Sequence, residues 1–188
     1  MPDVKAGALH PRIEELLEHL EETRGALLDA VQHVARDQRD ARPGDGRWTV
    51  GEVLDHVSRV EGGYARLLTK RVSDARTKGI ASETETSSIL GSVESGPLVD
   101  RGRKLQAPET VVPRPGATVD EGLVALEGSR AAVRAALVDA NGLALGMLTH
   151  QHPYFGTLNM YQWGVVLGYH DLRHADQIRE IADRARRG

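Results

Sequence analysis

The sequence predicts an all-α protein, a four-helix bundle with a long connection between its second and third helices. Aromatic residues make up only 4% of the 188-residue chain although 40% is hydrophobic, so the core must consist mainly of leucine, valine and alanine. Leucine and alanine are strong helix formers, whereas sheets favour aromatic and β-branched residues. Four long segments also carry one apolar stripe each, with the spacing of a helix face. A bundle buries four such stripes together.

The first helix is predicted over residues 11–36. Pro11 suits the first position of a helix because its φ angle is fixed near the helical value. Glu14 and Glu15 suit the positive end of the helix dipole. The apolar stripe contains Ile13, Leu16, Leu17, Leu20, Leu27, Leu28, Val31 and Val34. The run RPGDG at residues 42–46 then indicates a turn.

The second helix is predicted to begin at Thr49 and to end near residue 72. Thr49 and Glu52 have the spacing of a capping box, in which each side chain binds the backbone amide of the other residue. Trp48 and Val53 flank this cap at the spacing of a hydrophobic staple. The stripe contains Val53, Val57, Val60, Tyr64, Leu67 and Leu68.

The pattern is lost over residues 73–117, where serine, threonine, glycine and proline dominate. Connections of this length are uncommon in a compact domain and are often functional lids. We therefore expect a long loop or lid here, within a single domain of residues 1–188. The connection is long enough to cross the bundle, so the second and third helices could run parallel.

The last two helices follow this connection. Thr118 and Glu121 form a second capping-box pattern, and Asn141-Gly142 is a suitable stop for the third helix. The fourth helix is predicted to begin near Asn159, with Gln162 as its capping partner, and to continue to residue 188. The intervening segment, which contains His150, His152, Pro153 and Gly156, is expected to be a loop.

Composition excludes several classes of function. The net charge of −3 provides no basic face for nucleic acid. Cysteine is absent, which excludes disulfides, thiolate ligands and a cysteine nucleophile. Neither a signal peptide nor an apolar run long enough to span a membrane is found, so a cytoplasmic location is expected and a membrane partner is not.

Two histidines interrupt the apolar stripe of the fourth helix, which reads Trp163, Leu167, His170, His174 and Ile181. The spacing of four residues places both imidazoles on one helix face, close enough to share a metal ion. His56 lies at the edge of the second helix's stripe. Three histidines can therefore converge in one end of the bundle.

Two other interpretations stay open at this point. With eight histidines in the chain, about 0.3 pairs of this spacing arise by chance, so the pair alone is weak evidence. A core histidine is also more often hydrogen-bonded than metal-bound, and His19 fits that description. His150 and His152 form an alternative ligand pair, although Pro153 and Gly156 favour a structural turn.

Three segments resemble the DinB-like family: WTVGEVLDH at 48–56, HPYFGTLNMYQW at 152–163 and HDLRHADQ at 170–177. They occur in the expected order. The resemblance implies a four-helix bundle, often a homodimer, with a divalent metal ion held by His56, His170 and His174. Zinc or nickel is the expected ion, with manganese or iron as alternatives. Trp48 and Gln177 also match family positions, and we expect packing and an inward polar contact from them.

Relatives in this family include enzymes that use a small-molecule thiol and a metal-dependent hydrolase. The sequence therefore favours a metal-dependent S-transferase or hydrolase acting on a small electrophile, with metal-bound water or thiol as the reactive group. The alternative is a non-catalytic, stress-associated metal-binding dimer, in which Asp55 or His152 would be a fourth ligand. Four arginines that could bind a substrate carboxylate are interpreted as solvated charges: Arg59, Arg66, Arg103 and Arg173.

Overall fold

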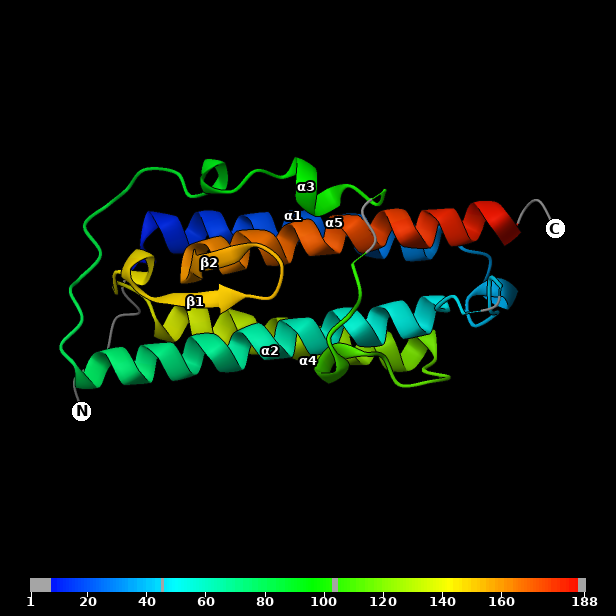
Figure 1. Cartoon of the computed structure of the whole chain (residues 1–188), viewed down its shortest axis with the longest axis horizontal. Coiled ribbons are helices and arrows are strands. Elements are labelled where there is room, and N and C mark those ends of the chain that lie inside the picture. The colour runs from blue at the N-terminus through cyan, green and yellow to red at the C-terminus, as the bar shows by residue number, and fades with distance from the viewer. Residues whose placement is uncertain (1–7, 45, 103–104, 186–188) are drawn as a thin grey trace.

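The computed structural model describes residues 8–44, 46–102 and 105–185. Four long helices lie side by side and confirm the predicted bundle (Figure 1). They are α1 (Pro11–Gln32), α2 (Val50–Thr77), α4 (Val119–Asp139) and α5 (Met160–Ala185). The shorter elements are α3 (Gly96–Val99), β1 (Thr149–His152), β2 (Gly156–Asn159) and the 3-10 turns η1 (Arg36–Gln38), η2 (Leu90–Ser92), η3 (Glu109–Val111) and η4 (Leu145–Met147).

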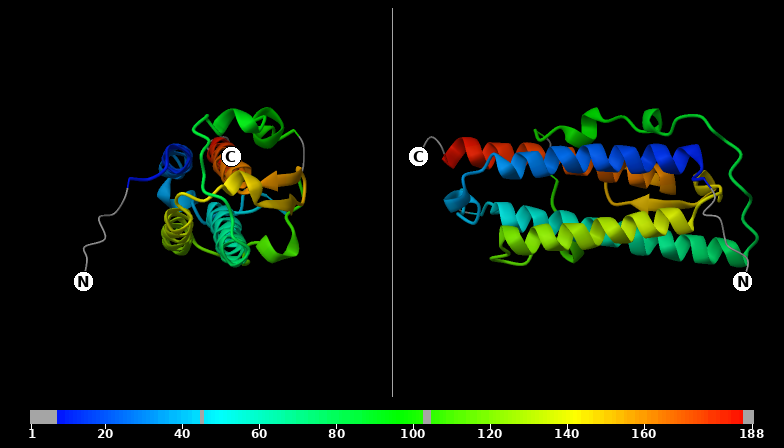
Figure 2. Two further views of the ribbon diagram at one scale, coloured as in Figure 1. Left: turned by 90° about the vertical axis from the view of Figure 1, so that its left-hand side faces the viewer. Right: turned by 180° about the vertical axis from the view of Figure 1, so that it is seen from behind.

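The helices form two parallel pairs, α1 with α5 and α2 with α4 (Figure 2). At the start of α2, Gly51 faces the backbone at the start of α4; a Cβ there would lie 2.8 Å from the Val119 nitrogen. At the other end, Arg76 of α2 donates to Asp139 of α4 at 2.8 Å. The second and third long helices therefore run parallel, as the connection length allowed.

The predicted helix starts are confirmed by their hydrogen bonds. In α2, the Thr49 amide donates to the Glu52 carboxylate at 2.9 Å, and the Glu52 amide donates to the Thr49 hydroxyl at 3.1 Å. Thr118 and Glu121 make the same reciprocal pair at the start of α4. Asn159 and Gln162 exchange two bonds of 2.9 and 3.0 Å before α5. These caps fix where α2, α4 and α5 begin.

Two helix ends differ from the prediction. α1 ends at Gln32 rather than near residue 36, since Ala35 adopts an extended backbone before a 3-10 turn. α2 continues to Thr77, so the first residues assigned to the connection 73–117 are helical. Its buried face is extended by Ala75, which is too small to mark an apolar stripe. The predicted end of α5 at residue 188 lies outside the described residues.

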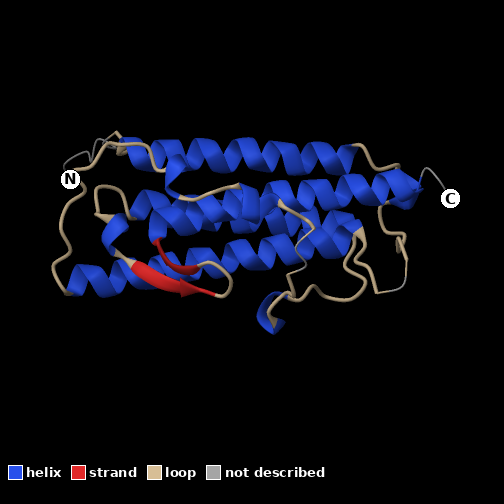
Figure 3. Cartoon of the chain, turned by 45° about the horizontal axis from the view of Figure 1, so that its top comes forward, coloured by secondary structure: helices blue, strands red, loops and turns tan. Residues whose placement is uncertain are grey.

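The loop predicted around His150 is instead an antiparallel β-hairpin, the red pair in Figure 3. His150 pairs with Leu158 and His152 with Gly156, where the chain turns with a φ of +74°. Leu158 is buried in a small cluster with Leu98 and Val166. The hairpin is therefore held by packing against the following helix α5 and against Leu98 of the connection, and the sequence of its short strands does not show this packing.

The connection between α2 and α4 returns along the length of the bundle (Figure 1). Its first part is bound to α1: Glu15 accepts hydrogen bonds from the Ser88 hydroxyl at 2.5 Å and the Ile89 amide at 2.8 Å. Ile89 and Leu98 bury their side chains against the helices. The connection and the hairpin thus cover the face that α2 and α5 form.

The core is divided into two apolar clusters with a buried charged layer between them. Each long helix contributes one residue to this layer, which we call the charged tetrad: Arg24 of α1, Glu61 of α2, Arg130 of α4 and Asp171 of α5. Each lies between apolar residues of the two clusters, as Arg24 does between Leu20 and Leu27.

The tetrad is tightly connected. Glu61 lies 2.7 Å from Arg24 and 2.6 Å from Arg130, and Asp171 lies 3.1 and 3.0 Å from the same two guanidinium groups. Ser129 donates a further bond to Glu61 at 2.5 Å. Two arginines and two carboxylates balance in charge, and their contacts fix the axial register of all four helices. Every described helix is too short or too polar to span a bilayer.

Candidate metal centre

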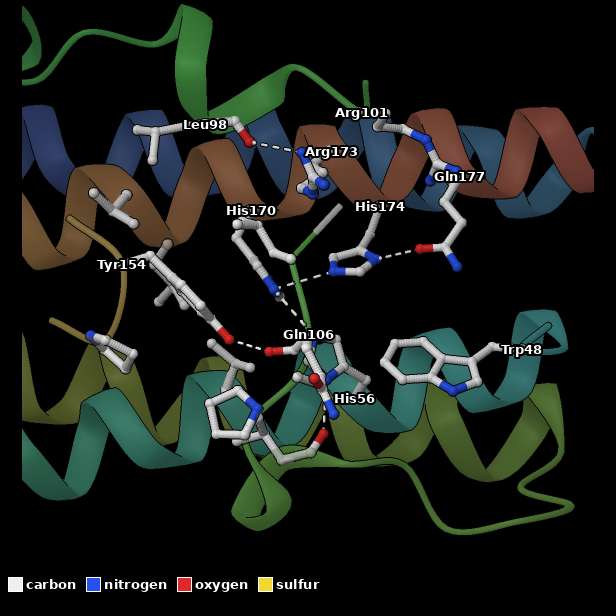
Figure 4. Close-up of a pocket in the computed structure, with 18 of the residues that line it drawn as sticks. Trp48, His56, Leu98, Arg101, Gln106, Tyr154, His170, Arg173, His174 and Gln177 are labelled. Carbon is white, nitrogen blue, oxygen red and sulfur yellow. Dashed lines mark hydrogen bonds between the residues drawn. The ribbon is translucent and has the colours of Figure 1, made fainter. Parts of the chain in front are cut away.

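The three predicted histidines meet between α2 and α5. The Nε2 atoms of His56 and His170 are 3.2 Å apart, and those of His174 and His170 are 3.1 Å apart. Ligand atoms of all three lie within 4.8 Å of one another. Figure 4 shows His170 and His174 pointing from α5 toward His56 on α2. Sequence spacing thus anticipated this convergence correctly.

The spacing of these nitrogens fits a shared ion. An ion bound 2.0–2.1 Å from imidazole nitrogens at tetrahedral angles holds them about 3.3–3.4 Å apart. The two measured separations are close to this value. The donor set, three imidazoles without thiolate or carboxylate, is one that zinc, nickel, copper and iron accept.

The outer nitrogens of two rings are already held in the orientation that ligation requires. His56 Nδ1 donates to the Val111 carbonyl at 2.7 Å, and His174 Nδ1 faces the Gln177 side-chain oxygen at 2.8 Å. A proton on Nδ1 leaves a lone pair on Nε2, which is the form that binds a metal. His170 Nδ1 is buried and has no hydrogen-bond partner among the described residues. The predicted polar role of Gln177 is confirmed.

Burial keeps this cluster uncharged. It lowers the pKa of His56, and it lowers the pKa values of His170 and His174 well below the ordinary value. Repulsion between the rings lowers the pKa of His170 further, and the charges of Arg173 and Arg101 act in the same direction on His174. Neutral imidazoles at physiological pH are available as ligands without a proton being displaced.

The histidines form part of the wall of a pocket of about 920 Å³. This volume lies within the usual range for small-molecule sites. Trp48 lies against His56, with ring centroids 4.9 Å apart, and Trp163, Phe155 and His152 contribute further aromatic surface. The three histidines therefore line a space large enough for a small molecule.

The outer wall of the pocket comes from the connection and the hairpin. The Tyr154 hydroxyl, at the tip of the hairpin, donates to the carbonyl of Gln106 in the connection (Figure 4). A few residues further, Val111 binds His56. The segment predicted as a long loop or lid thus supplies part of the site and holds one of its imidazoles.

The alternative ligands make other contacts and are not part of the group whose ligand atoms lie within 4.8 Å of one another. Asp55 accepts from Arg59 at 2.6 Å and from the Arg114 amide at 2.8 Å. His150 Nδ1 contacts Arg71 at 2.7 Å, and His152 Nδ1 accepts from the Tyr154 amide at 3.1 Å. Within the described ranges, no second group of three His, Asp or Glu side chains meets the same spacing.

The remaining histidines have structural positions. His19 is buried and its Nε2 lies 3.1 Å from the Val165 carbonyl, as expected for a core histidine. His10 caps α1 by accepting from the Arg12 amide. His33 is exposed after the end of α1. None of the three joins the cluster.

Sequence reasoning missed the arginines of the pocket. Arg173 is half-buried in its wall and donates to the carbonyls of Leu98 and Asp100, so its interpretation as a solvated charge is wrong. Arg101 lines the same wall. Arg59 pairs with Asp55 and Arg66 is exposed, in agreement with the prediction, and Arg103 lies outside the described residues.

The fold and the cluster define a four-helix bundle protein with three histidines that could hold a metal ion. The chain belongs to the DinB superfamily, whose family model matches residues 19–178. The uncharacterized protein YuaE of Bacillus subtilis (strain 168) is 25% identical over 173 residues, which cover 88% of this chain and 96% of YuaE.

A solved structure has the same architecture. TT2238, described as a four-helix bundle protein, matches with a TM-score of 0.59 and 22% identity over 89% of this chain and 98% of its own. At this level of identity the likeness supports the fold alone. The family and the fold are thereby established, and the chemistry has to be argued from the site.

Proposed function

We propose that the protein is a metal-dependent enzyme that transfers a small-molecule thiol to an electrophilic substrate or hydrolyses that substrate, with S-transfer preferred. The observation that carries this proposal is the convergence of three imidazole Nε2 atoms on the wall of a pocket. A closed structural site usually has four protein ligands, whereas a catalytic site keeps a position open. Membership in a metal-binding superfamily supports the same proposal.

The residues of the chain have separable roles in this proposal. His56, His170 and His174 would hold a divalent ion, zinc or nickel in first place. Such an ion supplies Lewis acidity, which lowers the pKa of a thiol or water that it binds. The Val111 carbonyl and Gln177 orient two of the imidazoles. Because the chain has no cysteine, the thiol would come from a small molecule.

The first test compares metal content in the wild-type protein and the His174→Ala variant after chelation and reloading with Zn²⁺, Ni²⁺ or Mn²⁺. We expect one ion per chain in the wild type and an affinity at least about 100-fold weaker in the variant, since even partners beyond the ligands are worth 10–100-fold. Elemental analysis of dialysed protein measures the metal content, and competition with a chromophoric chelator measures the affinity. His33→Ala removes an exposed histidine and is the matched control, expected to retain the ion.

Turnover is measured on the same samples with low-molecular-weight thiols and a reactive electrophile. The proposal requires that metal-loaded wild type consume the thiol or hydrolyse the electrophile and that His174→Ala fail to do so. Stoichiometric metal without turnover would instead identify a non-catalytic metal-binding protein. Full metal retention by His174→Ala would refute the three-histidine site itself.

The orienting role of Gln177 gives a separate prediction. Replacing Gln177 with leucine removes the acceptor of the His174 Nδ1 proton, 2.8 Å away, while keeping a similar side-chain size. We expect metal affinity to fall by about 10- to 100-fold. Gln177→Glu keeps an acceptor and is expected to retain the affinity. Competition with a chromophoric chelator measures both variants, and equal affinities of Gln177→Leu and wild type would contradict the prediction.

A further inference from the structure

One side of the pocket has an excess of positive charge. The charged residues of the described lining are four arginines and one glutamate: Arg47, Arg101, Arg173, Arg184 and Glu180. Three of the arginines surround the one carboxylate, with Glu180 2.6 Å from Arg101, 3.0 Å from Arg184 and 3.7 Å from Arg47. We call these five residues the arginine rim.

The charge of the rim is not balanced within the pocket. The four arginines and Glu180 leave a net charge of +3. Asp100, beyond the lining, also acts on Arg173, and counting its carboxylate leaves +2. Burial, and after it the charge of Arg101, lowers the pKa of Arg173. Like charges held together at a partly buried surface favour a bound anion, which removes their mutual repulsion.

The rim adjoins the histidine cluster. Arg173 precedes His174 in α5, and Figure 4 shows Arg101 and Arg173 on the α5 side of the pocket beside His174 and Gln177. The positive charges of Arg173 and Arg101 both lower the pKa of His174. A small molecule in this pocket can therefore reach the histidines with one end and the arginines with the other.

We propose that the arginine rim binds an anionic oxygen group, a carboxylate or a phosphate, of the small molecule whose reactive atom lies at the three histidines. This inference rests on the proposed function and names the chemical class of its ligand. Guanidinium groups match the planar oxygens of carboxylate and phosphate and bind them with charge-assisted hydrogen bonds. The aromatic surface of Trp48, Phe155 and Trp163 would contact the apolar part of that ligand.

The experiment uses the protein loaded with Co²⁺, whose absorption reports a bound thiolate. The probes are 3-mercaptopropionate and 3-mercapto-1-propanol, which share a thiol and a chain length and differ in charge. We expect the acid to bind about 10- to 100-fold more tightly, the range of one or two charge-assisted hydrogen bonds. The difference should shrink at high salt, because part of the rim is exposed. Equal dissociation constants at low salt would overturn the proposal.

Two variants of opposite charge separate electrostatics from damage to the fold. Arg101→Gln lowers the positive charge and is expected to reduce the preference for the acid. Glu180→Gln raises the positive charge and is expected to increase it. Weaker binding in both variants would overturn the proposal, since it would indicate structural damage rather than an anion site. Arg76→Gln, at the far end of α2, is the matched control and should keep the wild-type preference.

A metal-free arm makes the two proposals distinguishable. Glutarate and inorganic phosphate, which contain no thiol, are titrated into the metal-free protein by calorimetry. Failure of Zn²⁺, Ni²⁺, Mn²⁺ and Co²⁺ alike to bind would refute the proposed function. Anion binding that weakens in Arg101→Gln and strengthens in Glu180→Gln would support the arginine rim even then. The stronger of the two probes identifies the anion class. If each anion binds equally well to the wild type, Arg101→Gln and Glu180→Gln, the arginine-rim proposal is overturned and the proposed function is unaffected.

Discussion

Replacing Arg130 with methionine is expected to lower the free energy of unfolding by about 3–5 kcal/mol, the usual effect of removing one partner from a buried ionic network. The Glu61 and Asp171 carboxylates are 0% exposed, so water cannot replace the lost guanidinium. Asp171 already has one oxygen without a hydrogen-bond partner among the described residues. Urea denaturation of the metal-free protein measures the loss.

Two control variants test whether the loss in Arg130→Met comes from unpaired buried charge. Arg76→Gln breaks an exposed pair with Asp139 and is expected to cost about 0–1 kcal/mol. Replacing all four tetrad residues with apolar side chains of similar size is expected to be neutral or stabilising by about 1–4 kcal/mol. A loss below 1 kcal/mol for Arg130→Met would mean that the tetrad contributes little to the fold.

The tetrad also connects the stability of the fold with the geometry of the three-histidine cluster. Asp171 follows His170 in α5, and its bonds to Arg24 and Arg130 fix α5 relative to α1 and α4. A shift of α5 would move His170 and His174 together relative to His56 on α2. Arg130→Met is therefore expected to weaken metal binding although it touches none of the three histidines.

The helices were predictable because their signals are local. Capping boxes at Thr49 and Thr118 require residues only three positions apart, and each apolar stripe follows from one helix. The hairpin was not predictable in this way. Leu158 is its one buried side chain, and it packs with Val166 of α5 and with Leu98, which lies 60 residues earlier in the sequence. Its stability is a tertiary effect.

The histidine site was predictable for the same reason as the helices, since His170 and His174 interrupt an apolar stripe. The tetrad has the same signal: Arg24 stands four residues after Leu20 and three before Leu27, where a core side chain is expected. The carbonyl of Val111 and the arginine rim had no such signal. Val111, Arg47 and Arg101 belong to segments without periodicity, and Arg173, Glu180 and Arg184 are charged residues of α5 outside its apolar stripe. Only the folded chain brings them to the pocket.

Acidification is expected to destabilise the metal-free protein steeply. Burial lowers the pKa values of five histidines, which are His19, His56, His152, His170 and His174, and that of His152 falls to about 4. They remain neutral in the folded state, whereas in the unfolded chain they gain protons below a pH of about 6.5. Below this pH the unfolded state binds more protons than the folded state. The free energy of unfolding therefore has its highest value above a pH of about 6.5 and decreases as the pH falls below it.

The expected slope is large because the effects add. Each neutral histidine contributes up to about 1.4 kcal/mol per pH unit, so five contribute up to about 7 kcal/mol per unit. Asp171 opposes them. Burial raises its pKa to about 6, so below that pH the folded state binds a proton that the unfolded chain still lacks, which offsets one histidine. Since domains of this size are stable by about 5–15 kcal/mol, unfolding is expected within a few pH units below 6.5.

Denaturation curves at pH 7.5, 6.5 and 5.5 measure this slope. His19→Gln is expected to reduce the slope by up to about one proton, or 1.4 kcal/mol per pH unit, because burial lowers the pKa of His19 and this residue lies outside the three-histidine cluster. His33→Gln, at an exposed position, is expected to leave the slope unchanged. A free energy of unfolding that stays constant from pH 7.5 to 5.5 would show that the buried imidazoles accept protons without unfolding, and the neutral state inferred for the three-histidine cluster would then be wrong.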